Sequence, residues 1–516
     1  MTEQPNISNN KRIAKNTLYL YFRMLFTMGV SLYTSRVVLA TLGVEDYGIY
    51  NVVGGVVVLF SFINSAMASA TQRFLSFELG RNDINEVKRI FSMSMTVHFC
   101  IAMLIIVLGE TFGLWFLNTQ MNIPECRMMA ANWVYQISII TTCIGIIQTP
   151  YNASIIAYEK MSFYAYVGIV EVVLKLLLVF LLVHIAFDKL KLFSLMVFAV
   201  CIMVFGAYKV YCNKTLTTSR YNFFWDKPLF LKLINFSGWS LFGGVANVGK
   251  SQGINILINI FYGVTVNAAV AISNQVMGAI HGFTSNFQTA FNPQIVKLYA
   301  QDNRNALLNM IYRTSRYSFF LLFVISLPVL LNTDIILQIW LKTIPEYSGI
   351  FTQLNIVYML VNCISSPMWM TAAATGDIKK YQIIISAILL LNVLFSYILL
   401  KFHIAPYSVL IVSVAIEFIG MFYRIWFLRE KIQMPSIDFF KKVLLKLSFV
   451  VIISVLLAYY IKTLLPDNLL GAFVSIISTV VIIAISIYAV GIESRERYLV
   501  IKFVKNKMKK NAQTLY

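Results

Sequence analysis

Charged and amide side chains occur inside apolar stretches of this sequence, where they could bind a polar or anionic ligand. Lys250 lies near the middle of the apolar run at residues 236–261. The polar stripe beside it steps by four residues and consists of Asn247, Ser251, Asn255 and Asn259. A charge at mid-membrane costs about 2.5–3.5 kcal/mol unless it meets water or a partner. We therefore expect Lys250 to face a hydrated cavity, where an ammonium group can contact an anion such as phosphate.

The next apolar run, at residues 267–292, also has a polar face. That face consists of Asn274, Gly278, His281, Ser285, Gln288 and Asn292. Residues at these spacings share one side of a helix. Hydrocarbon would not tolerate such a side, so we expect it to point inward. Helix packing through small residues is one interpretation, and hydrogen bonds from Asn274, His281 and Gln288 to a substrate are the other.

The first apolar run, at residues 17–41, carries two arginines. Arg23 shares a helix face with Thr27, Ser31 and Thr34, and Arg36 lies on a neighbouring face. Each arginine is within about two turns of a membrane interface, so a long side chain could reach the headgroups. For Arg36, contact with the headgroups and contact with a substrate are equally good interpretations. For Arg23 we favour a position in a cavity.

Two carboxylates lie inside other apolar runs. Glu171 precedes Lys175 by four residues, the favourable order for a helical ion pair. An ion pair that lets both charges be buried is the first interpretation, and proton or sodium coupling through Glu171 is the second. Glu417 and Arg424 are seven residues apart and share a helix face, but Arg424 is near a helix end, where we expect it to reach the membrane surface.

The apolar runs themselves indicate a multi-pass membrane protein. The chain has 516 residues, of which 59% are hydrophobic and 12% charged, and its mean hydropathy is +0.74. A helix needs about 20 apolar residues to cross a bilayer, whereas the strands of a membrane barrel have about 10. The sequence therefore predicts an all-helical protein with about fourteen membrane helices, at residues 17–41, 47–72, 91–117, 128–157, 163–187, 192–212, 236–261, 267–292, 316–341, 349–374, 382–401, 405–428, 444–462 and 468–491.

The net charge of +20 follows from the orientation of the chain rather than from a nucleic-acid partner. Lysine and arginine gather in the tails and in every second connection, and the opposite connections hold few of them. This bias predicts that both termini are cytoplasmic. The basic tail from Arg495 to Lys510 is expected to lie against anionic membrane lipids. We expect no nucleic-acid partner.

A weak internal repeat divides the chain into two similar lobes. Ile123-Pro124-Glu125 recurs as Ile344-Pro345-Glu346, Gly43-Val44 as Gly263-Val264, and Pro150…Ala157…Tyr164 as Pro367…Ala374…Tyr381. The offsets of 221, 220 and 217 residues are nearly constant. Transporters with such repeats hold their substrate between the lobes. We expect six-helix lobes at residues 1–220 and 221–430, two extra helices within 431–491 and a cytoplasmic tail at 492–516.

Motifs of catalysis and metal binding are not evident. The sequence has no phosphate-binding glycine loop, no HExxH and no nucleophile elbow. Its six cysteines have no metal-ligand spacing. We therefore expect no enzyme activity, no metal and no cofactor. A membrane polysaccharide polymerase or ligase is a distant alternative, because the outward loops are short.

Three short motifs carry a resemblance to a known family. They are Lys15-Asn16-Thr17, the run from Leu42 to Tyr50 (LGVEDYGIY), and Ala70-Thr71-Gln72-Arg73-Phe74. With the two Pro-Glu loops, the chain resembles the O-antigen (Wzx-type) flippases, which form the polysaccharide-export branch of the multidrug/oligosaccharidyl-lipid/polysaccharide (MOP) superfamily. The resemblance covers nearly the whole chain and implies a MATE-like, alternating-access transporter in the bacterial inner membrane.

The substrate that this resemblance implies is an undecaprenyl-diphosphate-linked oligosaccharide. Arg23, Arg36 and Lys250 would then bind the diphosphate, since guanidinium and ammonium groups suit phosphate oxygens. The predicted sugar contacts are Asn247, Asn255, Asn274, His281 and Gln288. The main alternative is a cation-coupled multidrug exporter of the same superfamily. The first apolar run is evidence against this alternative, because it has two arginines and no carboxylate.

Overall fold

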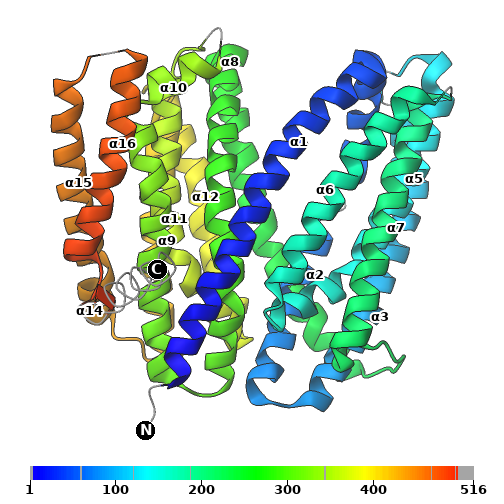
Figure 1. Cartoon of the computed structure of the whole chain (residues 1–516), viewed down its shortest axis with the longest axis horizontal. Helices are drawn as coiled ribbons and strands as arrows, with labels where there is room; N and C mark the ends of the chain where they lie inside the picture. The colour runs from blue at the N-terminus through cyan, green and yellow to red at the C-terminus, as the bar shows by residue number, and fades with distance from the viewer. Residues whose placement is uncertain are drawn as a thin grey trace, which may run out of the picture. The chain divides into compact units, whose positions relative to one another are not determined.

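The computed structural model is built from α-helices joined by short connections (Figure 1). It describes residues 4–58, 61–119, 121, 123–185, 187–341, 344–466, 468–493 and 496–497, apart from some side chains within these ranges. The longer helices are α1 (Gln4–Val58), α2 (Ser61–Arg81), α3 (Ile84–Leu108), α5 (Glu125–Ala157), α6 (Met161–His184), α7 (Lys189–Thr215), α8 (Lys227–Ala300), α9 (Arg304–Leu331), α11 (Ser348–Thr375), α12 (Lys379–Lys401), α13 (Ser408–Ile432), α15 (Leu445–Leu464) and α16 (Leu469–Ser486). The shorter ones are α4 (Leu114–Thr119), α10 (Thr333–Trp340) and α14 (Ser436–Phe439).

Eleven helices of the described part are long and apolar enough to cross a membrane. Each coincides with one of the fourteen predicted segments, so the chain is a multi-pass membrane protein. The other three predicted segments, at residues 17–41, 47–72 and 267–292, include side chains outside the described part. Their prediction stays untested, as does that of the tail after Arg497.

Two glycines interrupt the two longest helices at matching points of the repeat. Gly43 in α1 has φ 81° and ψ 168°, and Gly263 in α8 has φ 75° and ψ −171°. Only glycine adopts this backbone region readily, because a Cβ atom would clash. The two residues are 220 positions apart. The weak sequence match between them therefore marks the same local bend in both halves of the chain.

Two further pairs of left-handed residues recur at the repeat spacing. Asn82 and Asp302 follow α2 and α8 and have φ of 59° and 52°. Glu159 and Gly376 follow α5 and α11 and have φ of 59° and 79°. The pairs are 220 and 217 residues apart, as the repeat requires. Corresponding helices thus end in the same kind of turn, which agrees with the predicted pseudo-symmetric architecture.

The helices group into two compact units. Unit 1 comprises Met1–Asn247, Asn286–Arg304 and Met370–Ser386. In unit 1, α1 packs along α6 and α5 packs along α7 (Figure 1). One apolar cluster of this unit consists of Val38, Leu42, Val179, Leu182 and Phe193. The predicted domain boundaries at residues 220 and 430 stay a prediction.

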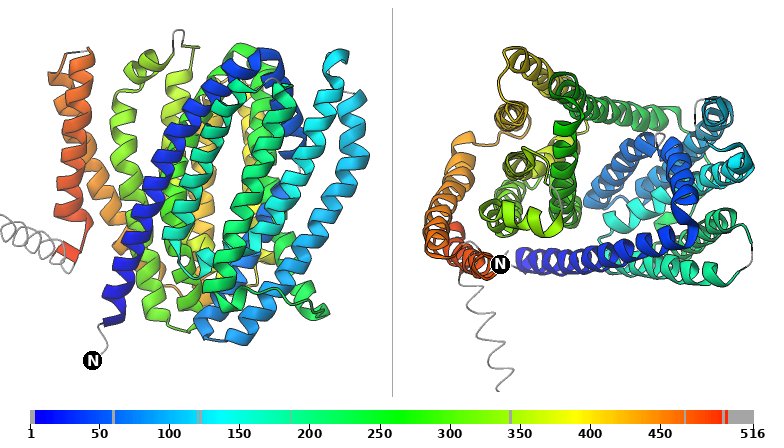
Figure 2. Two further views of the ribbon diagram at one scale, coloured as in Figure 1. Left: turned by 45° about the vertical axis from the view of Figure 1, so that its right-hand side comes forward. Right: turned by 90° about the horizontal axis from the view of Figure 1, so that it is seen from above.

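Unit 2 comprises Val248–Ser285, Asn305–Trp369 and the described residues from Ala387 onward. Helices α15 and α16, drawn in orange and red, run side by side within it (Figure 2). Arg316 of α9 is fully buried, and its Nη1 atom lies 2.9 Å from Glu493 Oε1. This ion pair fixes the segment after α16 to α9. The Glu493 side chain is 48% exposed, whereas Arg316 is buried and needs acceptors, so the contact helps to hold the end of the described chain in place.

Candidate transport site

A cavity of about 440 Å³ lies in unit 2, next to the break in α8. Its lining combines residues from before and after Gly263, namely Gln252, Asn255, Ile256, Asn259, Ile260, Ala271 and Asn274. The break allows both parts of the helix to face one space. Asn255 and Asn274, which were predicted from separate apolar runs, therefore share a cavity wall. Four amide side chains there can donate and accept hydrogen bonds, which suits a ligand rich in hydroxyl groups.

Lys250 does not line this cavity. Its side chain is 7% exposed, and its ammonium nitrogen lies 4.2 Å from the centroid of the Tyr358 ring on α11. A cation above an aromatic face is attracted by the ring, and the attraction is strongest where water is excluded. Among the described residues Lys250 makes no ion pair. The structure thus gives Lys250 an aromatic contact, and its position in a hydrated cavity stays a prediction.

A buried polar cluster lies beside this contact. Glu417 is 2% exposed, and its Oε1 atom accepts hydrogen bonds from Arg424 Nη1 at 2.8 Å and Asn362 Nδ2 at 3.1 Å. Glu417 also acts electrostatically on both Lys250 and Tyr358. The prediction that Arg424 reaches the membrane surface is wrong, because its side chain is only 11% exposed and pairs with Glu417. The shared helix face, in contrast, is confirmed.

Arg23 repeats the aromatic contact in unit 1. Its guanidinium carbon lies 4.2 Å from the centroid of the Tyr164 ring on α6. A Cβ atom on Gly168 would lie 2.9 Å from Arg23 Cδ, so this glycine makes room for the arginine. Arg23 makes no ion pair within the described part of the chain. The side chain of Arg36 lies outside the described residues.

Glu171 and Lys175 form the predicted ion pair within α6. Lys175 Nζ lies 2.7 Å from Glu171 Oε1. The expected burial is wrong, because the side chains of Lys175 and Glu171 are 39% and 36% exposed. Pairing on one helix requires only local spacing, whereas burial requires a neighbouring helix to cover the pair. Whether Glu171 couples transport to protons or sodium stays a prediction.

Three predicted sugar contacts lie away from the cavity lining. Asn247 and His281 are exposed, and Gln288 is partly exposed. Sequence reasoning missed two residues of the buried cluster, Tyr358 and Asn362. They are four positions apart on α11, so a polar face within that apolar run could have revealed them.

Known proteins share the fold of this chain but not its sequence. No family model matches the sequence, and neither does any curated protein. Among solved structures, MATE in the straight conformation is similar with a TM-score of 0.69 and 11% identity, over 82% of this chain and 96% of that one. The predicted MATE-like, all-helical fold is therefore confirmed.

Two further structures extend this comparison. An outward-facing multidrug resistance MATE family transporter of the MOP superfamily has a TM-score of 0.69 and 11% identity. A MOP superfamily transporter from Pyrococcus furiosus, for which a binding pocket of reverse polarity suggests a different function, has a TM-score of 0.63 and 12% identity. Both comparisons cover 82% of this chain and 96% of the other. At such identity the likeness defines the fold and leaves the substrate open.

Proposed function

We propose that this protein is an alternating-access flippase. Its substrate is an undecaprenyl-diphosphate-linked oligosaccharide, such as an O-antigen or capsule repeat unit. It moves this lipid from the cytoplasmic to the periplasmic leaflet of a bacterial inner membrane. The MATE-like fold supports a transporter, because its structural neighbours include MOP superfamily transporters. The reverse-polarity pocket described for one of them indicates that pocket charge can differ within this fold.

One observation carries the choice of an anionic substrate. Lys250 lies in a membrane helix and Arg23 in the predicted membrane segment 17–41. Neither has an ion-pair partner among the described residues, and each lies 4.2 Å from a tyrosine ring. An aromatic face stabilises a cation without neutralising it. Neither charge is neutralised in an ion pair, and we expect another state of the transport cycle to present both to phosphate oxygens, which form stronger contacts with ammonium and guanidinium groups than a ring does.

The remaining parts of the substrate fit other features of the chain. The amide-lined cavity beside Gly263 offers hydrogen bonds to sugar hydroxyls. The lipid tail can stay in the bilayer, so that only the headgroup crosses. The alternative is a cation-coupled multidrug exporter, for which the buried carboxylate of Glu417 would be the coupling group. Arg424 holds that carboxylate at 2.8 Å, which favours a structural role.

Lys250→Ala tests the proposal most directly. We expect the variant, expressed in a strain that lacks the native copy, to abolish surface polysaccharide and to accumulate the lipid-linked precursor. Lys250→Arg should keep part of the activity, because Arg also binds phosphate, with different geometry. Lys250→Glu should be worse than alanine, because it repels the diphosphate. Quantitative polysaccharide staining and precursor extraction measure these outcomes.

Lys401→Ala is the matched control, since Lys401 is an exposed lysine at the end of α12. All variants are compared at equal membrane protein level. Normal polysaccharide in Lys250→Ala would contradict a substrate contact at Lys250. Normal polysaccharide together with lost resistance to cationic dyes would favour the multidrug alternative.

A further inference from the structure

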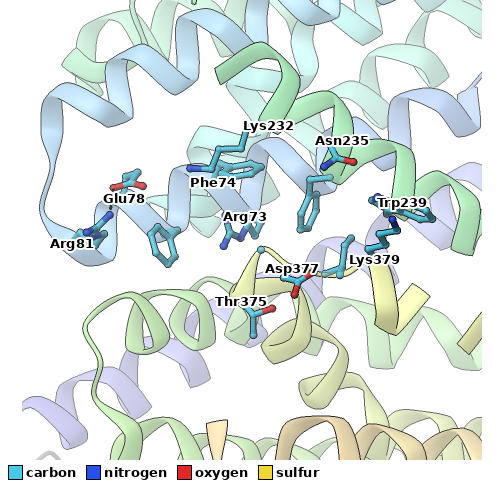
Figure 3. A pocket seen from close by; sticks show the side chains of 14 residues that line it. Arg73, Phe74, Glu78, Arg81, Lys232, Asn235, Trp239, Thr375, Asp377 and Lys379 are labelled. Carbon is cyan, nitrogen blue, oxygen red and sulfur yellow. Dashed lines mark ion pairs between the residues drawn. The ribbon is translucent and has the colours of Figure 1, made fainter. Parts of the chain in front are cut away.

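A second cavity, of about 640 Å³, lies within unit 1 (Figure 3). The end of α2, the start of α8 and the connection from α11 to α12 form its walls. Its charged residues are Arg73, Glu78, Arg81, Lys232, Asp377 and Lys379. Cavities of about 300–1,000 Å³ hold small molecules and cofactors. The pocket is therefore large enough for a headgroup-sized ligand, and cations outnumber carboxylates in its lining.

Two of the four cations are already engaged by the protein. Arg73 donates to the carbonyl oxygens of Ala373 at 3.1 Å and Ala374 at 2.5 Å. Arg81 lies 3.8 Å from the carboxylate of Glu78. These two arginines are thus held by acceptors on the chain and contribute a fixed positive wall.

The two lysines of the pocket have no such acceptor. Lys232 Nζ lies 5.4 Å from the centroid of the Phe74 ring, and Lys379 Nζ lies 5.4 Å from that of Trp239. Within the described residues neither lysine makes a hydrogen bond or an ion pair. Aromatic contacts orient both ammonium groups but leave their donors unused.

A neutral donor accompanies the two lysines. Figure 3 shows Lys232 and Asn235 on the wall that α8 forms, with Thr375 and Asp377 on the other side of the pocket. The Asn235 amide can add hydrogen bonds to an anion that two ammonium groups attract, whereas the Thr375 hydroxyl already donates to the carbonyl oxygen of Ala372 at 2.7 Å. Phosphate, with its negative charge and several acceptor oxygens, satisfies this set of donors.

We propose that this pocket binds a phosphate group, with Lys232 and Lys379 as its cationic contacts. The group belongs either to a prenyl-diphosphate headgroup or to a soluble phosphate compound. The connections that carry these lysines are among those that the charge bias places on the cytoplasmic side. The prenyl source rests on the proposed function, whereas phosphate binding itself does not.

Binding to the purified full-length protein in neutral detergent tests this inference. The probes are farnesyl diphosphate and inorganic pyrophosphate, titrated calorimetrically at constant ionic strength. We expect saturable binding to the wild type. Removing charge-assisted contacts should weaken it at least about tenfold in the Lys232→Ala/Lys379→Ala double variant. Lys227→Ala, which removes an exposed lysine from the start of α8 outside the pocket, should bind like the wild type.

The two probes distinguish the sources of the phosphate. Tighter binding of farnesyl diphosphate assigns the pocket to a lipid-linked headgroup, and equal binding assigns it to a soluble phosphate. Absence of saturable binding by both probes would overturn the proposal, and so would an equal loss in Lys227→Ala. Failure of the polysaccharide experiment alongside intact pyrophosphate binding would reject the flippase function alone.

Discussion

Two contacts at corresponding places of the repeat hold unit 1 together by different chemistry. In the last turn of α11, the guanidinium group of Arg73 binds the carbonyl oxygens of Ala373 and Ala374, close to Gly376. After α5, the residue that corresponds to Gly376 is Glu159, and its side chain is 1% exposed. Side chains from the end of α8 and from α1, rather than from α2, supply the donors there. Arg73 corresponds to Pro293, the neighbour of the donor Gln294.

The carboxylate of Glu159 gathers three donors. Gln294 Nε2 lies 2.5 Å away, Lys297 Nζ 2.7 Å and Arg12 Nε 2.8 Å. At the other contact a Cβ atom on Gly376 would lie 2.8 Å from Arg73 Nη2, so a larger residue would displace the guanidinium group. The repeat has therefore kept the left-handed turn and the place of contact. The charged residue, in contrast, differs between the two contacts. At one it is the cation Arg73, which binds backbone carbonyls, and at the other it is the anion Glu159, which binds side chains.

The largest expected effect is that of Glu159→Ala. It would leave Lys297, whose side chain is 19% exposed, without its carboxylate. Breaking a buried pair in this way costs about 3–5 kcal/mol. The free energy of unfolding in detergent, from denaturant titration, measures the loss. Glu86→Ala removes a surface carboxylate that pairs with Arg89 and should change stability by less than about 1 kcal/mol. A similar loss in both variants would contradict the comparison.

Arg73→Ala should cost less, about 1.5–3 kcal/mol, because hydrogen bonds from a charged donor are lost but no opposite charge is stranded. Arg73→Lys should recover only part of this lost stability, since one ammonium group lacks the planar fork that spans two carbonyl oxygens. The same unfolding titration measures both variants. If Arg73→Ala proved more destabilising than Glu159→Ala, the hydrogen bonds of Arg73 to the backbone would contribute more to the stability of unit 1 than the ion pairs of Glu159.

Gly376→Ala should have the smallest effect of the three. A left-handed alanine costs roughly 1–2 kcal/mol, and its Cβ atom also meets Arg73 Nη2. In a double-mutant cycle, Gly376→Ala should cost less when Arg73 is alanine, because that clash is then absent. Strictly additive free energies of unfolding would show that the glycine is needed for its backbone conformation alone.

The fold could be predicted from the sequence to a large extent because membrane helices leave a local signal. Apolar length gave eleven segments that the structure confirms. The match of Gly43 with Gly263 was one dipeptide in a weak alignment, yet both residues have the same glycine-only conformation. A backbone conformation that only glycine adopts readily requires glycine at both positions, even where the identity between the two halves is low.

The site could be predicted only where partners are close in sequence. Glu171 and Lys175 lie on one helix, and their pairing was expected. Lys250 instead meets Tyr358, more than a hundred residues away, so helical periodicity could not reveal the aromatic contact. Glu159 lies in a short polar connection and was overlooked altogether, because its donors Gln294 and Lys297 lie far along the chain.

The break at Gly263 has a consequence for how the chain is threaded into the bilayer. Helix α8 counts 74 residues. An unbroken helix of that length would extend roughly 110 Å at 1.5 Å per residue, more than twice the 40–45 Å or so of a whole bilayer with its headgroups. One residue without a side chain thus divides an element that is too long for a single crossing. We predict that the part after Gly263 is a separate crossing, in which case the sidedness of every later segment depends on this residue.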